Sequence, residues 1–366
     1  MSALSRSRLV ITLLVGMVGI TTGARATPLD ATNLINTYNL IVFNNLTNNS
    51  HVDGSALVGG NTMGGTYAQH VNLAGTALTV GKTLSGGVTL NGSGLIVGGT
   101  IATSYLNGNG GGDFYIGGNV SSGWVNANSS KVYLGGSIAP GAGINNATSL
   151  SLNSSVATNK IAAVTSDIAA AQSSLTAYSR QLSTLAADST ISSNNYGLLT
   201  FNATPGADGV AVFSITSAAL LNSAREIVFS LNGAKEVVIN VSGIGASQLT
   251  LNANFLAGSA QQLGTNTVWN FTDAAKIDVT SQFGGTILAV LADLSNSQNI
   301  EGTVIAKNLI QNGEIHYDGV NANLVSPVPL PGALTLFGSA LFGLGAFARR
   351  GRKRRGDAPS DADASR

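Results

Sequence analysis

The chain has 366 residues, of which 46 are glycine, 6% are aromatic and only 10% are charged. This composition is too apolar for a disordered polymer, and it is typical of short strands joined by tight turns. Cysteine is absent, which excludes disulfides, a thiol nucleophile and thiolate metal sites. From residue 27 to residue 331, eight basic residues stand against fourteen acidic ones, a net charge of −6. We therefore exclude nucleic acid as a partner, because an acidic body does not attract the phosphate backbone.

Residues 1–26 have the pattern of a secretory signal peptide. Two arginines precede an apolar run, and Ala24 and Ala26 have the small-x-small spacing that a signal peptidase requires. Thr27 is therefore the expected first residue of the mature protein, and the secretion translocon and signal peptidase are expected partners. A membrane anchor is the alternative interpretation, but the apolar run is short for that role.

A glycine-centred phrase recurs through residues 27–153. Each copy is a short apolar segment that ends on a glycine, and the copies follow one another at intervals of 17 to 22 residues. The first glycines of the copies are Gly59, Gly81, Gly98, Gly117 and Gly135. One such corner per repeat of about 20 residues predicts a β-solenoid whose rungs stack about 4.8 Å apart. We expect the corner glycines to adopt positive φ, and a closed β-sandwich is the alternative fold.

Residues 154–188 change to a helical pattern. Apolar residues on helical spacing are Ile161, Val164, Ile168, Leu175, Tyr178, Leu182 and Leu185. Alanines lie between them and glycine and proline are absent, which predicts one long amphipathic helix or a broken pair. We expect this helix to cover an apolar face or an open end of the solenoid. A coiled coil that joins copies of the chain is the alternative.

Strand-sized segments return over residues 189–322. They are rich in β-branched and aromatic residues, and Asn-Gly and other glycine-containing turns separate them. This pattern predicts a second part of the solenoid, so that the fold class is all-β with one long inserted helix. Residues 323–331 are an expected extended linker, because proline fixes φ and disfavours the α region for the residue before it.

The C-terminal residues have the pattern of a membrane helix followed by a basic stop. The run from Pro331 to Ala348 has 18 residues without a charge, and as a helix it would span roughly 27 Å, close to the thickness of a hydrocarbon core. We assign residues 332–348 to a transmembrane helix of the precursor and 349–366 to a cytoplasmic tail, since basic residues stay on the cytoplasmic side. The basic residues are Arg349, Arg350, Arg352, Lys353, Arg354 and Arg355.

The motif before this helix resembles a known sorting signal. Val328-Pro329-Leu330-Pro331, the apolar helix and the basic cluster together resemble a PEP-CTERM signal of the VPLP variant. Leu330 stands where the eponymous motif has glutamate, and eleven residues follow the basic cluster. The resemblance implies recognition and cleavage by an exosortase in the inner membrane of a Gram-negative bacterium that makes extracellular polysaccharide. A permanent single-pass anchor is the alternative.

The body between the two ends resembles the choice-of-anchor A family domain over nearly its whole length. The stretches that carry this resemblance are "VDGSALVGGN", "VVINVSG", "VWNFTDA", "GGTILAVLADL" and "IEGTVIAKNLIQNGEIHYDG". The resemblance implies an extracellular domain that is coupled to different anchoring tails in different bacteria. It also implies a right-handed β-helix with a helical element at its side, similar in outline to bacterial ice-binding proteins.

No catalytic or metal-binding motif stands out in the body. The histidines His51, His70 and His316 lie far apart and lack metal-ligand spacing, so we expect structural histidines and no cofactor or metal. Nucleophile elbows, phosphate loops and HExxH patterns are absent from the sequence.

Several aspartates adjoin turns, where this residue commonly caps backbone amides. Asp53, Asp113 and Asp273 are the carboxylates that an acid–base enzyme would use, but eight basic residues are a poor supply for neutralising uronates. Calcium binding by Asp53, Asp113 and Asp318 beside glycine-rich turns is a weak alternative, because the nonapeptide calcium repeat is absent.

These features together predict an exported, non-enzymatic protein with a structural or adhesive role in exopolysaccharide or biofilm. Its precursor would be held in the inner membrane with the body outside, before release to the envelope, surface or matrix. Extracellular polysaccharide or further copies of the chain are the expected partners. A ligand-specific adhesin or an ice-binding protein is the alternative, although Thr-x-Thr ranks occur only as fragments such as Thr100 and Thr103. A polysaccharide-active enzyme is the more distant one.

Overall fold

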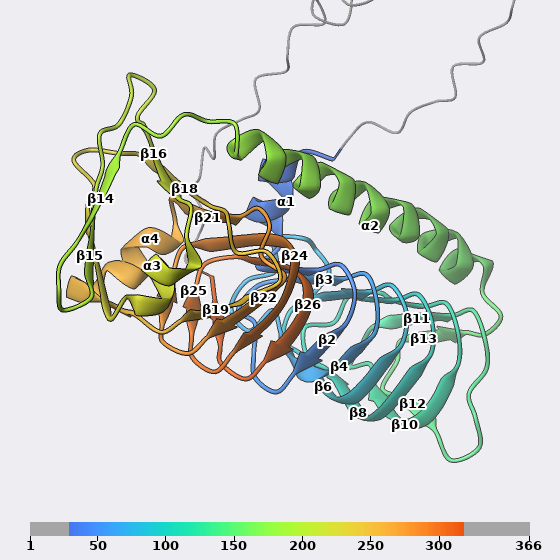
Figure 1. The fold of residues 1–366 in the computed structure, drawn as a ribbon. Helices are drawn as coiled ribbons and strands as arrows, with labels where there is room; N and C mark the ends of the chain where they lie inside the picture. The colour runs from blue at the N-terminus through green and yellow to red at the C-terminus, as the bar shows by residue number, and fades with distance from the viewer. Residues whose placement is uncertain (1–28, 318–366) are drawn as a thin grey trace, which may run out of the picture.

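Parallel pairing between short strands defines the architecture, which the computed structural model describes for residues 29–317 (Figure 1). On either side of the long helix, each turn of the chain places its strands directly on those of the turn before. For example, β3 (Ala56–Val58) pairs in register with β5 (Leu78–Val80), and β5 pairs with β7 (Leu95–Val97). This stacking confirms the predicted β-solenoid. It excludes the β-sandwich, because the strands of a sandwich pair antiparallel.

Each full turn has three faces, and two of them belong to one large sheet. The first face consists of β1 (Leu40–Val42), β3, β5, β7, β9 (Phe114–Ile116), β11 (Lys131–Leu134), β13 (Ser149–Ser151), β16 (Val210–Ile215), β18 (Glu236–Val241), β21 (Thr267–Phe271) and the first halves of β24 (Thr286–Asn296) and β26 (Val304–Gln311). A long helix lies along this face, which we call the covered face.

The second face carries no helix, and we call it the open face. It consists of β2 (Leu46–Asn48), β4 (Thr62–Tyr67), β6 (Leu84–Leu90), β8 (Ile101–Gly108), β10 (Val120–Asn126), β12 (Gly143–Asn145), β19 (Gln248–Leu251), β22 (Lys276–Val279) and the second halves of β24 and β26. Smaller sheets form the third face from β14 (Thr190–Ser193), β15 (Leu198–Asn202), β17 (Glu226–Ser230), β20 (Asn254–Phe255), β23 (Phe283–Gly284), β25 (Ile300–Glu301) and β27 (Ile315–His316).

The order of the turns along the axis differs from their order in the sequence. The first strand, β1, lies in the middle of the stack, where it pairs with β3 on one side and with β26 on the other. The chain winds outward from β1 to β13, crosses to the opposite end, and returns from β16 to β26. We call the contact between the first and last turns the seam. One hydrophobic core contains buried residues from both halves, so the two predicted solenoid parts are a single stack.

The crossing between the two ends is made by α2 (Ser155–Leu182), the predicted long helix (Figure 1). Ser154 caps its N-terminus by accepting a hydrogen bond from the Ala157 N–H. The shorter helices are α1 (Ala31–Thr37), α3 (Ala218–Ser223), α4 (Ser259–Gly264) and the 3₁₀ turn η1 (Leu256–Gly258). Within residues 29–317, none of these helices is both long and apolar enough to cross a membrane.

A second hydrophobic core joins α2 to the covered face. Its buried residues include Leu175, Tyr178 and Leu182 of the helix and outward-facing residues such as Leu57 and Val238 of the strands. The helix therefore buries its apolar stripe on the solenoid of its own chain, as the covering interpretation requires, and not in a coiled coil. Three buried polar bonds also connect the two: Asn270 Nδ2 donates to Ser179 O at 2.8 Å, Asn240 Nδ2 to Leu182 O at 2.7 Å, and Ser179 Oγ to Asn270 Oδ1 at 2.6 Å.

The corner glycines form a ladder along the covered face, but the expected reason for glycine was wrong. Gly59, Gly81, Gly98, Gly117 and Gly135 all have ordinary negative or extended φ, since none has a positive value. Glycine is required because the turns approach closely here. A Cβ at Gly98 would lie only 2.1 Å from the Gly81 carbonyl oxygen, and one at Gly81 only 2.2 Å from that of Gly59. The bare ladder also lets α2 approach, with Ile168 Cγ2 3.1 Å from the Cβ position of Gly59.

Candidate functional site

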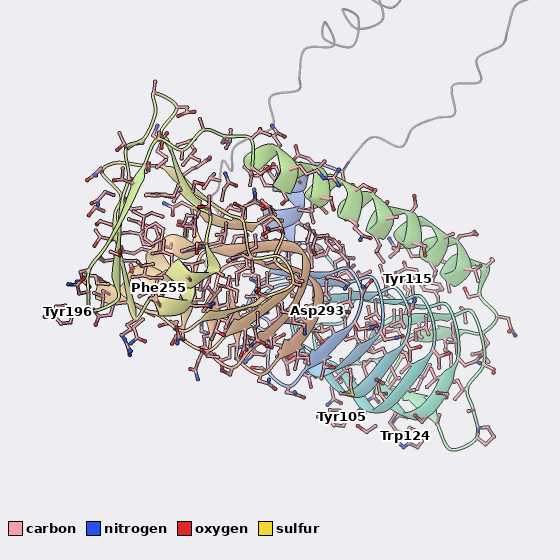
Figure 2. All side chains as sticks on the ribbon, in the orientation of Figure 1. Tyr105, Tyr115, Trp124, Tyr196, Phe255 and Asp293 are labelled. Atoms are coloured by element: carbon pink, nitrogen blue, oxygen red, sulfur yellow. The ribbon has the colours of Figure 1, made fainter. Side chains whose placement is uncertain are left out.

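The open face is the broad surface on the side away from α2 (Figure 2). Along each of its strands, alternate side chains point into the core and out to solvent, as the pleat of a β-strand dictates. In β8, for example, Ile101 and Thr103 are buried, and a register shift then leaves Ser104 and Tyr105 both exposed before Leu106 is buried again. The strands are parallel, and after shifts in register the outward residues of successive strands line up, for example Tyr105 with Trp124 and Asn107 with Asn126.

Two large aromatic side chains stand on this face. Tyr105 on β8 and Trp124 on β10 are partners in the parallel ladder, and they are 48% and 50% exposed (Figure 2). Each ring lies against a glycine of the next strand. The Cβ position of Gly87 is 2.7 Å from Tyr105 Cζ, and that of Gly143 is 2.2 Å from Trp124 Cζ3. The two rings therefore extend in opposite directions, that of Tyr105 over β6 and that of Trp124 over β12. We call them the aromatic pair.

A row of amides and hydroxyls runs beside the aromatic pair. Thr66, Thr89, Asn107, Asn126 and Asn145 are register neighbours on β4, β6, β8, β10 and β12. Asn126 Nδ2 donates to Asn107 Oδ1 at 2.8 Å, and Asn145 Nδ2 donates to Asn126 Oδ1 at 3.3 Å. Each amide in this chain has further donor and acceptor capacity that faces solvent. The amide row thus offers hydrogen bonds at regular intervals of about 4.8 Å.

The surface around the aromatic pair is hollowed and uncharged. A hollow of about 450 Å³ adjoins Tyr105, and Met63, Thr66, Gly87 and Thr89 also line it. None of the residues in β4, β6, β8, β10 and β12 is Asp, Glu, Lys or Arg. Charge on the open face lies in the other half, where Lys307 Nζ is 3.5 Å from Asp293 Oδ1. The hollow and the aromatic pair can therefore stack on and hydrogen-bond a neutral ligand.

The amide row consists only in part of threonine, which bears on the ice-binding alternative. A flat array would need outward threonines repeated in ranks, but the amide row changes from threonine to asparagine after Thr89. Thr103 is 1% exposed and points inward. Tyr105 and Trp124 also occupy outward positions of the described open face, so threonine does not fill it.

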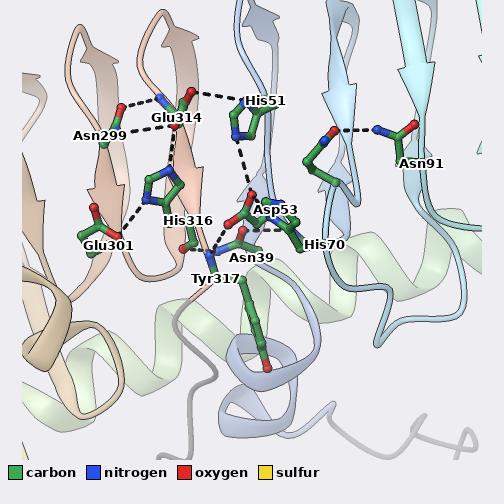
Figure 3. A network of polar contacts seen from close by, with 12 residues as sticks. Asn39, His51, Asp53, His70, Asn91, Asn299, Glu301, Glu314, His316 and Tyr317 are labelled. Atoms are coloured by element: carbon green, nitrogen blue, oxygen red, sulfur yellow. Dashed lines mark hydrogen bonds and ion pairs between the residues drawn. The ribbon is translucent and has the colours of Figure 1, made fainter.

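The three histidines are distant only in the sequence, so their expected separation was wrong. The rings of His51 and His316 are 6.2 Å apart, and Glu314 lies between them (Figure 3). His70 Nδ1 is 2.7 Å from Asp53 Oδ1. The hydrogen bond from His316 lowers the pKa of the Glu314 carboxyl. Burial alone would lower the pKa of His316, but its bonds to Glu314 and to Glu301 outweigh that effect and raise the pKa.

The aspartates near turns accept hydrogen bonds, although not all from the backbone. Asp273 caps a turn, since its oxygens accept from the Gly243 N–H at 2.8 Å and the Ile244 N–H at 3.2 Å. Asp53 Oδ2 accepts from the Tyr317 N–H at 3.2 Å. Asp113 instead accepts from the Tyr115 hydroxyl at 3.2 Å. Asp318 lies outside the described residues.

The two predicted processing sites also lie outside residues 29–317. These are the signal-peptidase site at Ala24, Ala26 and Thr27, and the sorting motif at residues 328–331 with its transmembrane helix and basic stop. The aromatic pair, by contrast, was missed in the sequence although a signal was present. Tyr105 and Trp124 each follow a corner glycine, Gly98 and Gly117, by seven residues, so two successive repeats place an aromatic residue at the same outward position.

Comparison with known families agrees with this architecture. A family model with the description "Putative Ice-binding-like adhesive domain" matches residues 31–317. No curated protein and no solved structure shows a significant similarity to the chain. The match begins at the start of α1 and ends at the last described residue, so it covers both halves of the solenoid and the helix between them. The chain belongs to this family of ice-binding-like adhesive domains.

Proposed function

We propose that this protein is an exported, non-enzymatic adhesin that binds a neutral polysaccharide of the cell surface or extracellular matrix through its open face. The observation that carries the proposal is the aromatic pair beside an uncharged amide row. Membership of an adhesive domain family agrees with it.

The chemistry of the aromatic pair suits a sugar ring. One face of a pyranose consists of C–H groups, which pack on the electron-rich face of an aromatic ring, and the hydroxyls at its rim need hydrogen-bond partners. Tyr105 and Trp124 supply the apolar surface, and Asn107 and Asn126 supply amides alongside. A polymer that lies along the solenoid axis would contact both rings and successive side chains of the amide row. The absence of charge on β4, β6, β8, β10 and β12 favours neutral sugars over uronates.

Replacing Trp124 or Tyr105 with alanine tests this proposal. Each change is expected to weaken binding about tenfold, because it removes half of the stacking surface from a site that depends on few contacts. The measurement is binding of the purified full chain to an array of neutral glucans, mannans and galactans, with uronate polymers for comparison.

The matched control is Tyr196→Ala, because Tyr196 is 85% exposed and lies at the far end of the molecule (Figure 2). Its replacement is expected to leave glycan binding unchanged. Equal binding by the wild type, Trp124→Ala and Tyr105→Ala would refute the role of the open face. Stronger binding to uronates than to neutral polymers would refute the predicted ligand class.

We further propose that the precursor is processed at both ends, as its resemblance to choice-of-anchor A proteins with a PEP-CTERM signal suggests. Signal peptidase would cut after Ala26, and an exosortase would cut near Pro329 and Pro331 once the basic stop had held the tail in the inner membrane. The body would then join the extracellular matrix or biofilm. Support comes from the order of motifs in the sequence.

Replacing Pro329 and Pro331 together with alanine is expected to leave the full-length form in the membrane. Proline keeps the motif extended for a protease, and alanine permits the adjoining helix to continue into it. Immunoblotting of membrane and medium fractions measures the ratio of the two forms. An intact Arg366 on the wild-type surface form, detected by mass spectrometry, would instead identify a permanent anchor.

A further inference from the structure

Three short segments stack on the third face at the seam, and each has an apolar residue between two polar ones. They are residues 299–301, 314–316 and 51–53, which belong to successive turns although the last is far from the others in sequence. Their central residues, Ile300, Ile315 and Val52, are completely buried. Because side chains alternate along a strand, the flanking residues all point away from the core and form two polar rows, in one of which Glu301 and Asp53 are buried.

Three of these flanking side chains converge. The ligand-type atoms of His51, Glu314 and His316 all lie within 4.8 Å of one another (Figure 3). One Glu314 oxygen is 2.7 Å from His316 Nε2, and the other is 3.6 Å from His51 Nδ1. Donor atoms around a tetrahedral Zn²⁺ lie roughly 3.3 Å apart. Small side-chain rotations therefore bring these three groups to coordinating distance.

A second carboxylate stands behind each imidazole. Glu301, which is 2% exposed, lies 2.9 Å from His316 Nδ1 through one oxygen. Asp53 Oδ1 lies 3.6 Å from His51 Nε2. A carboxylate on one ring nitrogen holds the proton there, so that the lone pair of the other nitrogen is presented to a metal. Glu301 is close enough to do this for His316, whose Nε2 faces Glu314. Asp53 is only at ion-pair distance from His51 Nε2, and the Nδ1 of His51 faces Glu314.

The negative charge of the surrounding carboxylates also favours binding of a cation. Asp53, Glu301 and Glu314 bring three carboxylates together, and within the described part of the chain all their ion pairs are with histidines. Lysine and arginine do not neutralise them in residues 29–317. A divalent ion between His51, Glu314 and His316 would offset most of this charge, and it would replace the hydrogen bond that now joins Glu314 to His316.

We propose that His51, Glu314 and His316 bind one divalent transition-metal ion of the Zn²⁺ type. Two imidazoles and one carboxylate are ligands that this class of metal prefers. The side chains of His51 and His316 are each 28% exposed and that of Glu314 is 39% exposed, so an ion can enter from solvent. Such an ion would cross-link the first and last turns of the solenoid. The proposal does not depend on glycan binding, because the site lies on a different face.

Calorimetric titration of the purified full chain with ZnCl₂, after treatment with a chelator, tests the site. One ion per chain is expected to bind, and saturation is expected to raise the unfolding temperature by about 5 °C, since an ion that binds only the folded state stabilises it. His51→Gln, Glu314→Gln and His316→Gln are each expected to weaken binding at least tenfold. His70→Gln makes the same change in a histidine that contacts Asp53 but lies outside the triad, and it is expected to bind like the wild type.

Spectroscopic measurements distinguish a variant that has lost the metal site from one that fails to fold. Co²⁺ bound to the wild type is expected to give the visible absorption of a four- or five-coordinate site, and the circular dichroism of each variant in chelator reports whether it is folded. Wild-type protein that binds no stoichiometric Zn²⁺ would overturn the proposal. Folded Glu314→Gln and His316→Gln variants that bind Zn²⁺ as tightly as the wild type would do so as well.

Discussion

Replacing Gly98 with alanine is expected to lower the free energy of unfolding by about 3 kcal/mol, the cost of forcing atoms into a close-packed site. The new Cβ would lie 2.1 Å from the Gly81 carbonyl oxygen and 2.8 Å from its carbon. Both atoms are backbone, so relief requires the turns to separate. That separation would lengthen the hydrogen bond from the Gly98 N–H to Val80 O, now 2.7 Å. Urea denaturation measures the effect as a lower midpoint with an unchanged slope.

Gly75→Ala is the matched control for this prediction. A Cβ at Gly75 meets no atom within 4 Å, but its φ of +65° makes alanine mildly unfavourable. We therefore expect a cost of about 1 kcal/mol from backbone strain alone. If Gly98→Ala cost no more than Gly75→Ala, close approach between turns would not be the reason for the glycine ladder.

Replacing Asn39 with alanine is expected to destabilise the fold by about 4 kcal/mol, because it leaves buried backbone groups without partners. Asn39 is 1% exposed and lies at the seam. Its Nδ2 donates to the carbonyl oxygens of Gly302 and His316, each at 3.1 Å, and its Oδ1 accepts from the Gly54 N–H at 3.0 Å. One side chain thus joins the first turn of the solenoid to the last two.

Asn33→Ala serves as the control for Asn39→Ala. Asn33 is exposed on α1, where alanine has the higher helix propensity, so this change is expected to be neutral or slightly stabilising. Urea denaturation again gives the comparison. Limited proteolysis adds a second readout, because a weakened seam should expose residues near β1 and β27 before the ends of the stack. Similar stability of the two variants would show that the seam does not depend on the amide of Asn39.

The division between a covered and an open face links the fold to the proposed function. Helix α2 buries the outward apolar residues of one face, and the third face consists of short strands and turns. The open face is thus the broad regular surface that remains available to a ligand. The aromatic pair lies on β8 and β10, toward the β12 end of this face, in the half whose strands have no charge.

Local patterns in the sequence were sufficient to predict the class of fold. The corner glycines recur once per turn because each turn must pass close to the one below it. The spacing of these glycines in the sequence therefore gives the period of the solenoid. The helical segment was also predicted, because its apolar spacing is a local feature, but only the structure shows one unbroken helix. The conformational reason given for the glycines was wrong, because a glycine needed for positive φ and a glycine needed for close approach are identical in a sequence.

The order of the turns and the composition of the candidate sites were decided by tertiary structure. Residues 40–42 pair with 304–306, and nothing local to either segment specifies a partner so distant in the chain. That pairing creates the seam and brings His51 to Glu314 and His316. Alternation along a strand predicts which side chains point outward, but not which face a helix will cover. Only the packing of α2 left Tyr105 and Trp124 facing solvent, because a face becomes a binding surface when no other part of the chain buries it.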